Sequence, residues 1–140
     1  MILTTKGRYA VMAVIEIADS ETKKPLPLFL IAEKQNISLS YLEQIFSHLR
    51  KGGIVKAVKG PGGGYVLAKD AKEITIANII NAIGESIKMT RCNDSKNGCI
   101  APNNAKCKTH NLWHGLEKNI YSYLESISLH DVCCGGLKIQ

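Results

Sequence analysis

The stretch SLSYLEQIFSHLRKGGIVKAVKGPGGGYVL, residues 38–67, decides the fold, because its hydrophobic pattern changes from helical to extended within a few residues. The first part predicts a helix that ends at the pair Gly52-Gly53 and whose apolar face is Leu42, Ile45, Phe46 and Leu49. Ser40 and Glu43 fit a capping box at the start of this helix. The second part, 54–68, predicts a hairpin of two strands around the glycine-rich turn KGPGGG.

Three further helices are expected in the first 87 residues. The segment from Thr4 or Thr5, either a plausible N-cap, is almost wholly apolar from Tyr9 to Ile15 and predicts a buried helix. Residues 28–35 predict a short helix, and the tight link before residue 38 makes this pair a helix-turn-helix. A fourth helix is expected in EITIANIINAIGES, residues 73–86. Three helices followed by a hairpin have the order of a winged helix-turn-helix, so the fold class is mostly α.

The last segment, residues 111–140, predicts a long helix and a short tail. Its apolar residues step by three or four positions and form a narrow stripe, Trp113, Leu116, Ile120, Tyr123 and Ile127. A helix of about 17 residues is roughly 25 Å long and would overhang so small a domain. We therefore expect the stripe to pack against the same stripe of a second copy in a homodimer.

Charge favours a polyanionic partner. The formal net charge is +6, and residues 1–72 carry 11 Lys or Arg against 6 Asp or Glu, whereas residues 73–140 carry 7 against 6. A basic half that also contains a helix-turn-helix indicates nucleic-acid binding. No signal sequence or membrane span is evident, so we expect a cytoplasmic protein without a membrane partner. No pair of carboxylates and no nucleophile with an evident base suggests catalysis, so we expect no enzyme.

Candidate contacts to duplex DNA lie on the helix of residues 38–51 and on the turn. The outward positions of the helix are Ser38, Ser40, Tyr41, Glu43, Gln44 and Ser47. Gln44 can pair with adenine and Glu43 can accept from cytosine, although the capping box would compete for Glu43. The turn presents Lys59, Gly60, Pro61, Gly62, Gly63 and Gly64 to phosphates or the minor groove. Arg50, Lys51 and Lys56 add positive charge around them.

The segment RCNDSKNGCIAPNNAKCKTH carries four candidate metal ligands, Cys92, Cys99, Cys107 and His110. So polar a segment cannot pack a core, but an inorganic centre would order it. Three thiolates and one imidazole can bind tetrahedral zinc or an iron–sulfur cluster, and the wide spacing suits a cluster better. His114 is a rival nitrogen ligand, and we expect Cys133 and Cys134 to be reduced thiols of the tail.

The chain resembles the iron–sulfur cluster regulator (IscR) family of bacterial winged-helix transcription factors. The resemblance runs to about Asp131 and rests on TKGRYAV, ISLSYLEQIFSHLRKGG, VKGPGGGY, RC and CKTHNLW, in that order. It implies a [2Fe-2S] cluster on Cys92, Cys99, Cys107 and His110, with iron–sulfur assembly proteins as cluster donors. It also implies a homodimer joined through the long C-terminal helix and, besides the residues above, DNA contacts from Lys6 and Arg8.

The resulting expectation is a cluster-sensing transcriptional regulator, mainly a repressor, of iron–sulfur assembly genes. Its domains would be residues 1–87 for DNA, 88–110 for the cluster and 111–140 for dimerisation. The open alternatives are a nitric-oxide- or redox-sensing relative with other target genes, a cluster carrier on a winged-helix scaffold, and a zinc-stabilised interaction module.

Overall fold

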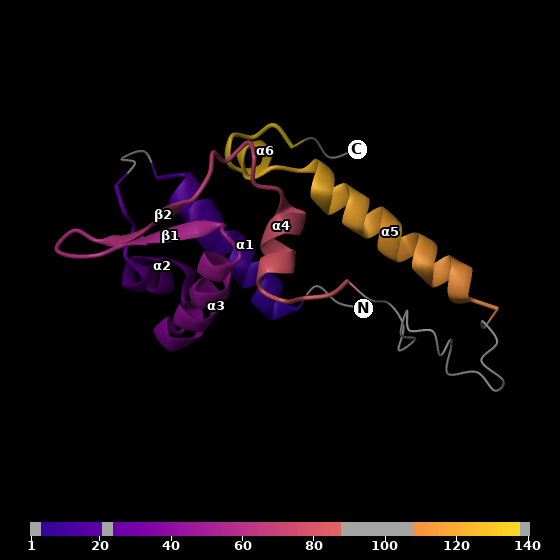
Figure 1. Cartoon of the computed structure of the whole chain (residues 1–140), viewed down its shortest axis with the longest axis horizontal. Coiled ribbons are helices and arrows are strands. Elements are labelled where there is room, and N and C mark those ends of the chain that lie inside the picture. The colour runs from indigo at the N-terminus through magenta and orange to yellow at the C-terminus, as the bar shows by residue number, and fades with distance from the viewer. Residues whose placement is uncertain (1–3, 21–23, 88–107, 138–140) are drawn as a thin grey trace.

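The computed structural model describes residues 4–20, 24–87 and 108–137. Within these residues a compact helical body carries a two-stranded hairpin on one side and one long helix on the other (Figure 1). The mostly helical winged helix-turn-helix fold is therefore confirmed. The elements, in chain order, are α1 Thr5–Ala18, α2 Leu28–Gln35, α3 Leu39–Lys51, β1 Val55–Val58, β2 Gly64–Leu67, α4 Ile76–Ala82, α5 His110–Ser126 and α6 Leu129–Cys133.

Helix α1 runs through the centre of the body. Thr4 caps it, because the Thr4 hydroxyl accepts a hydrogen bond from the backbone of Gly7 at 3.4 Å. Ala10, Ala13 and Val14 are completely buried, which confirms the buried helix expected here. Small side chains at Ala10 and Ala13 let the surrounding helices pack close to the α1 backbone.

Helices α2 and α3 form the helix-turn-helix. Asn36 ends α2 in the left-handed conformation, with φ 53° and ψ 49°, and Ile37 is buried in the turn. The N-cap of α3 is Ser38, whose hydroxyl accepts from the backbone N–H of Tyr41. The expected capping box of Ser40 and Glu43 was thus wrong, because the turn closes at Ile37 and the helix begins two residues earlier than that box requires. The expected apolar face is confirmed, with Leu42, Ile45, Phe46 and Leu49 all fully buried.

Strands β1 and β2 form the wing, an antiparallel hairpin in which Val55 pairs with Leu67 and Val58 with Gly64. Gly60 and Gly62 have φ values of 98° and 74° in the turn, a conformation that other residues rarely adopt. The base of the wing is anchored by Tyr65. Its ring packs edge-on against Phe46 of α3, with ring centroids 4.9 Å apart.

Helix α4 closes the core beneath α1 and α3. A capping box of Thr75 and Asn78 begins it, and Ile76, Ile79 and Ile80 are buried. The helix is shorter than the pattern of residues 73–86 indicated, because Ile83 already caps its C-terminal end. No helix in the described parts of the chain is long and apolar enough to cross a membrane.

Helix α5 leaves the body at an angle and none of its residues is fully buried (Figure 1). The chain then returns to the body at Ile127, whose carbonyl accepts from the backbone N–H of Ile76 at 2.9 Å, while Leu129 donates to Ile74 at 2.8 Å. Ile127 is only 8% exposed and belongs to the core. It therefore does not continue the exposed stripe, as the i, i+4 spacing from Tyr123 had suggested. The segment expected to be a tail includes a further helix, α6, which packs on α1.

Candidate nucleic-acid interface

The outer face of α3 offers polar side chains directly opposite its buried face. Ser40, Glu43 and Gln44 are exposed, and Ser47 is half-buried. The carboxylate of Glu43 and the amide of Gln44 form no hydrogen bond within the described residues, so both can bind an external partner. Because Ser38 caps the helix, the competition for Glu43 expected from the sequence is absent here.

The start of α3 is held against the start of α1 by two tyrosines. The rings of Tyr9 and Tyr41 meet edge to face, with centroids 6.1 Å apart. Arg8, the residue before Tyr9 in α1, is exposed. Lys6 is different, because its ammonium donates a hydrogen bond to the backbone carbonyl of Ile83 at 3.3 Å. Its side chain therefore makes a contact within the protein.

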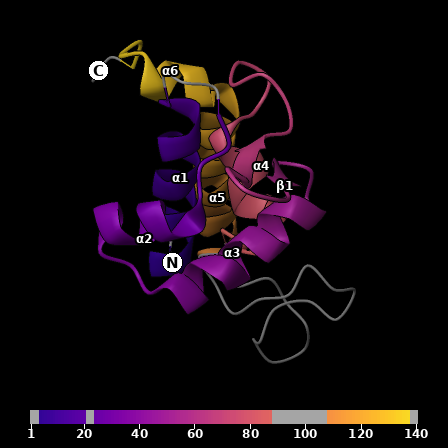
Figure 2. The same ribbon diagram turned by 90° about the vertical axis from the view of Figure 1, so that its left-hand side faces the viewer.

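Positive charge surrounds this face. Arg50 and Lys51 lie at the end of α3, Lys56 is exposed on β1, and Lys59 begins the turn of the wing. These four side chains make no hydrogen bond or ion pair with any residue that the structure describes, so their charge is available to phosphates. The wing projects from the body on the side away from α5 (Figure 1), and the end-on view shows α3 as an outer helix (Figure 2). A projecting glycine-rich turn beside an outer helix can follow a groove and the adjacent DNA backbone.

Of the four candidate metal ligands, only His110 lies within the described residues. Cys92, Cys99 and Cys107 fall outside them, so their mutual geometry stays untested. His110 begins α5, is half-buried, and stacks on His114 with ring centroids 5.9 Å apart and an interplanar angle of 13°. Among described residues no group of three or more His, Cys, Asp or Glu is placed to hold a metal ion.

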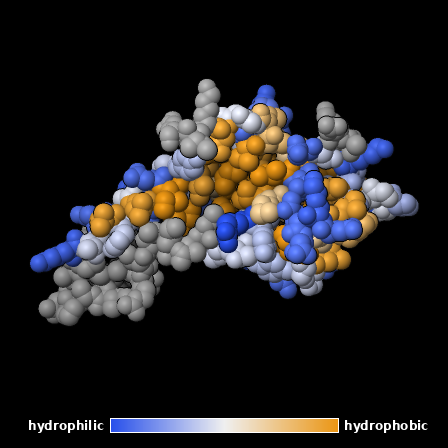
Figure 3. Space-filling view, turned by 180° about the vertical axis from the view of Figure 1, so that it is seen from behind, coloured by the Kyte–Doolittle hydropathy of each residue, from blue (hydrophilic) through white to orange (hydrophobic). Residues whose placement is uncertain are grey.

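An apolar face runs along α5 on the side away from α4. The side chains turned to α4 are polar, with Tyr121 accepting from the amide of Asn81 at 3.0 Å. The other side carries the apolar residues, of which Leu112, Leu116 and Tyr123 are 61%, 37% and 58% exposed. Figure 3 shows hydrophobic side chains along this arm that continue onto the body. Met12 of α1 is 41% exposed. Trp113 and Ile120 are half-buried members of the same face. Leu112 was missed from the sequence, although its i, i+4 spacing to Leu116 could have revealed it.

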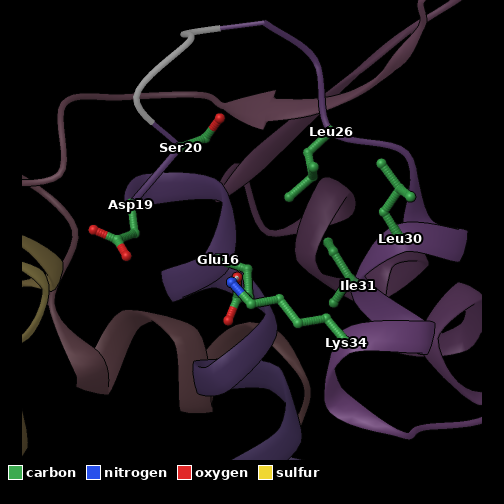
Figure 4. A pocket seen from close by; sticks show the side chains of 7 residues that line it. All are labelled: Glu16, Asp19, Ser20, Leu26, Leu30, Ile31 and Lys34. Carbon is green, nitrogen blue, oxygen red and sulfur yellow. Dashed lines mark hydrogen bonds and ion pairs between the residues drawn. The ribbon is translucent and has the colours of Figure 1, made fainter.

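A small cavity of about 190 Å³ lies between α1 and α2 (Figure 4). The ammonium of Lys34 reaches across it to the carboxylate of Glu16 at 2.6 Å, and these two groups neutralise each other. The hydrogen bond to Glu16, followed by the negative charge of Glu16, raises the pKa of Lys34. Pockets for small organic ligands usually measure about 300–1,000 Å³, so this cavity is a gap bridged by an ion pair rather than a substrate site.

Comparison with known proteins agrees with this geometry. The sequence matches the Rrf2 family, described as "Iron-dependent Transcriptional regulator", over residues 3–135. It is similar to the "HTH-type transcriptional regulator IscR" of Photorhabdus laumondii subsp. laumondii, at 51% identity over 132 residues, which cover 94% of this chain and 79% of that protein.

Two solved structures have a similar fold. The structure titled "T. potens IscR" has a TM-score of 0.77 at 31% identity and covers all of this chain and 93% of that one. CymR, "the Global Cysteine Regulator of B. subtilis", has a TM-score of 0.78 at 30% identity, with 96% and 97% of the two chains covered.

Proposed function

Because this chain belongs to the Rrf2 family of iron-dependent transcriptional regulators, we propose that it senses the supply of iron–sulfur clusters and controls the genes that assemble them. It is an IscR-type helix-turn-helix regulator that binds DNA, and it is not an enzyme. The observation that carries the proposal is the 51% identity to a regulator named IscR, together with three cysteines that precede a histidine at the start of α5.

The proposed cofactor is a [2Fe-2S] cluster held by Cys92, Cys99, Cys107 and His110. The donor set fits, because three thiolates and one imidazole are all groups that bind iron in such clusters. His110 also fits, since its ring is half-buried at the first residue of α5 and its described neighbours leave it free of a competing salt bridge. When bound, the cluster would supply a ligand-dependent link between the cysteine segment and α5. An imidazole ligand is lost when it becomes protonated, so this centre would be more labile than one with four thiolates.

In the proposed DNA complex the two kinds of polar residue have different tasks. Gln44 and Glu43, exposed and unpaired on the outer face of α3, would read base edges in the major groove. Lys59, Arg50 and the glycine turn, Gly60 to Gly64, would bind phosphates or the minor groove and hold the register. Ser38, Ser40, Tyr41 and Ser47 would line the same contact, with Arg8 at its edge. Lys6 would act indirectly, by tying the start of α1 to the end of α4.

A homodimer would cover the apolar face of α5. Exposed apolar residues on one side of a helix that projects into solvent are typical of an interface, and a second copy presents the same face. The proposed interface comprises Trp113, Leu116, Ile120 and Tyr123, with Leu112 added and Ile127 left in the core. Two copies would place two α3 helices at about one turn of DNA, roughly 34 Å apart.

Binding of the proposed iron–sulfur cluster would affect the position of α3 through α5. His110 begins this helix, and the residue after it, Ile127, is hydrogen-bonded to the first residue of α4. Helix α4 in turn packs against α3. A ligand that holds the first turn of α5 therefore acts on a continuous chain of packed elements. The proposal includes a cytoplasmic location, where free thiols stay reduced, and cluster donors from the assembly machinery.

The experiment is anaerobic purification of the full chain and of Cys92→Ala, with iron, sulfide and zinc analysis, visible absorption, and binding to a promoter fragment of an iron–sulfur assembly operon. We expect brown wild-type protein with about two irons and two sulfides per chain, bleaching in Cys92→Ala, and a change in promoter binding. Cys134→Ser is the matched control and should keep its colour. Colourless protein with stoichiometric zinc would refute cluster sensing while leaving DNA binding in place.

A further inference from the structure

A second thiol site lies on α6, away from the proposed cluster ligands. Cys133 and Cys134 are adjacent in sequence, and each thiol has a polar partner. The Cys133 thiol donates to the Asp19 carboxylate at 3.5 Å, and the Cys134 sulfur lies 3.5 Å from Nδ1 of His130. The peptide bond between Cys133 and Cys134 joins these two contacts. Four side chains thus form one connected cluster, which neither the DNA contact nor the cluster ligands use.

The packing of α6 against the body holds this group of thiols and their partners, the thiol cluster, in place. Ser128 and Asp131 form a capping box at the start of this helix, and Leu129 is completely buried. The hydrogen bond that the Ser128 backbone N–H donates to the Asp131 carboxylate at 3.0 Å lowers the pKa of Asp131, and the Ser128 side chain lowers it further. In Figure 4 the carboxylate of Asp19 points away from the Glu16–Lys34 pair, toward the side where the C-terminal segment passes. Asp19 therefore lines the rim of the cavity between α1 and α2 and also contacts the Cys133 thiol.

The two thiols have opposite environments. Burial, followed by the hydrogen bond and negative charge of Asp19, raises the pKa of Cys133 to about 11. Cys133 thus stays protonated near neutral pH and is half-buried. Cys134 is exposed, and its hydrogen-bonding partner among the residues that the structure describes is the His130 ring rather than a carboxylate. Since the thiolate is the nucleophile, Cys134 is the reactive member of the pair.

We propose that Cys134 is a modification site for low-molecular-weight disulfides, with His130 as the acceptor of its proton and Cys133 as a protected neighbour. The Cys134 proton moves to Nδ1 of His130, and the thiolate attacks one sulfur of the incoming disulfide. A new S–S bond forms between Cys134 and that sulfur, while the old S–S bond breaks. Its electron pair leaves with the second half as a thiolate, which takes the proton from His130. Cys134 is oxidised and half of the disulfide is reduced to a thiol.

The mixed disulfide persists, because Cys133 is a poor resolving thiol. Consecutive Cα atoms are about 3.8 Å apart, less than the roughly 4.4–6.8 Å that ordinary disulfides span. Asp19 also keeps the proton on Cys133. The site is independent of the proposed cluster, since α5 separates His110 from α6 by 17 residues, or about 25 Å. The regulator would therefore respond to disulfides through a thiol on α6, the helix that follows α5 and packs against α1.

The test uses the full chain under anaerobic conditions with glutathione disulfide as the probe. Trypsin cleavage after Lys118 and Lys138 yields a peptide whose only cysteines are Cys133 and Cys134, so adducts elsewhere are not counted. A synthetic peptide of residues 128–137 is the unfolded reference. The variants are Cys134→Ser, Cys133→Ser and His130→Gln, each compared with wild type by circular dichroism.

Over the time in which Cys134 is fully labelled, we expect one glutathionyl group, on Cys134, in wild type and in Cys133→Ser, and little on this peptide in Cys134→Ser. In the folded chain Cys133 should react about 10-fold more slowly than in the reference peptide. Its raised pKa lowers the fraction of thiolate about 100-fold, but the more basic thiolate is about 8-fold more nucleophilic, and the two effects partly cancel. His130→Gln should slow Cys134 to the rate of the reference peptide. Equal labelling of the two thiols, a wild-type Cys134 rate no faster than the reference, or closure to a disulfide without an adduct would each overturn the proposal.

Discussion

Replacing Ser38 with alanine should destabilise the folded chain by about 0.5–1 kcal/mol, because Ser38 rather than Ser40 caps α3. Loss of an N-cap hydroxyl typically costs about 0.5–2 kcal/mol. Here the Ser38 oxygen lies 3.5 Å from the backbone nitrogen of Tyr41, which is long for a hydrogen bond, and the site is exposed. We therefore place the effect in the lower part of that range, equivalent to a decrease in Tm of about 2–4 °C.

Ser40→Ala is the matched control, since it removes the same hydroxyl two residues later. Ser40 lies in the first turn of α3, where alanine has the higher helix propensity by up to about 0.5 kcal/mol. Its hydroxyl makes only an exposed contact with that of Ser38, at 3.0 Å. Ser40→Ala should therefore be neutral or slightly stabilising. Glu43→Gln should also leave stability unchanged, because no capping box uses its carboxylate.

The assay is equilibrium urea unfolding of cluster-free protein, followed by circular dichroism at one fixed chain concentration, because association would shift the apparent stability. Midpoints are compared at a common m-value, which avoids most of the extrapolation error. A loss of about 1 kcal/mol in Ser40→Ala with no loss in Ser38→Ala would refute the assigned helix start. That result would also restore the capping competition for Glu43 and weaken its role in reading DNA.

Two predictions concern DNA binding and assembly. Gln44→Ala should reduce the binding free energy by about 1–3 kcal/mol at one operator position only, whereas Lys59→Ala should weaken binding to all sequences alike and reduce the salt dependence of the affinity by about one unit of slope. Fluorescence anisotropy on an operator and its single-base variants measures both effects. An equal loss of affinity on all these sequences in Gln44→Ala would contradict base reading. Tyr123→Asp, at a side chain 58% exposed, should convert a dimer into monomers in sedimentation analysis with the fold retained, while Tyr121→Phe on the α4 side of α5 should stay dimeric; an unchanged dimer in Tyr123→Asp would exclude this face.

Local patterns were sufficient to predict most of the winged helix. The four apolar positions of α3 share a helical face, and all are buried in the structure. The glycine turn of the wing is local as well, since Gly60 and Gly62 adopt conformations that glycine permits. The start of α3 was not predictable in this way, because two serines compete as caps and burial of Ile37, a tertiary effect, decides between them.

The C-terminal part shows why periodicity alone is insufficient. Tyr123 and Ile127 are four residues apart and look like one stripe, but Ile127 lies in the core and Tyr123 in solvent. The sequence Ser128-Leu-His-Asp131 does contain the signal of a new helix, a serine followed three residues later by an acid. The contact between Asp19 and Cys133 joins residues 114 positions apart, so no local pattern could predict the thiol cluster. The ligand set of the cysteine segment stays a prediction from residue chemistry.

The free energy required of the proposed switch is small compared with the contacts that join α5 to the body. A tenfold change in DNA affinity corresponds to about 1.4 kcal/mol, and a typical protein hydrogen bond contributes about 0.5–1.5 kcal/mol. Helix α5 is tied to α4 by the Asn81–Tyr121 hydrogen bond at its middle and by the backbone bond between Ile76 and Ile127 at its end. A ligand at His110 that favours one position of α5 by the energy of one or two such bonds would change operator affinity tenfold. The winged helix itself need not refold. In the proposed homodimer, only the position of α3 and α4 in one copy relative to those in the other has to change.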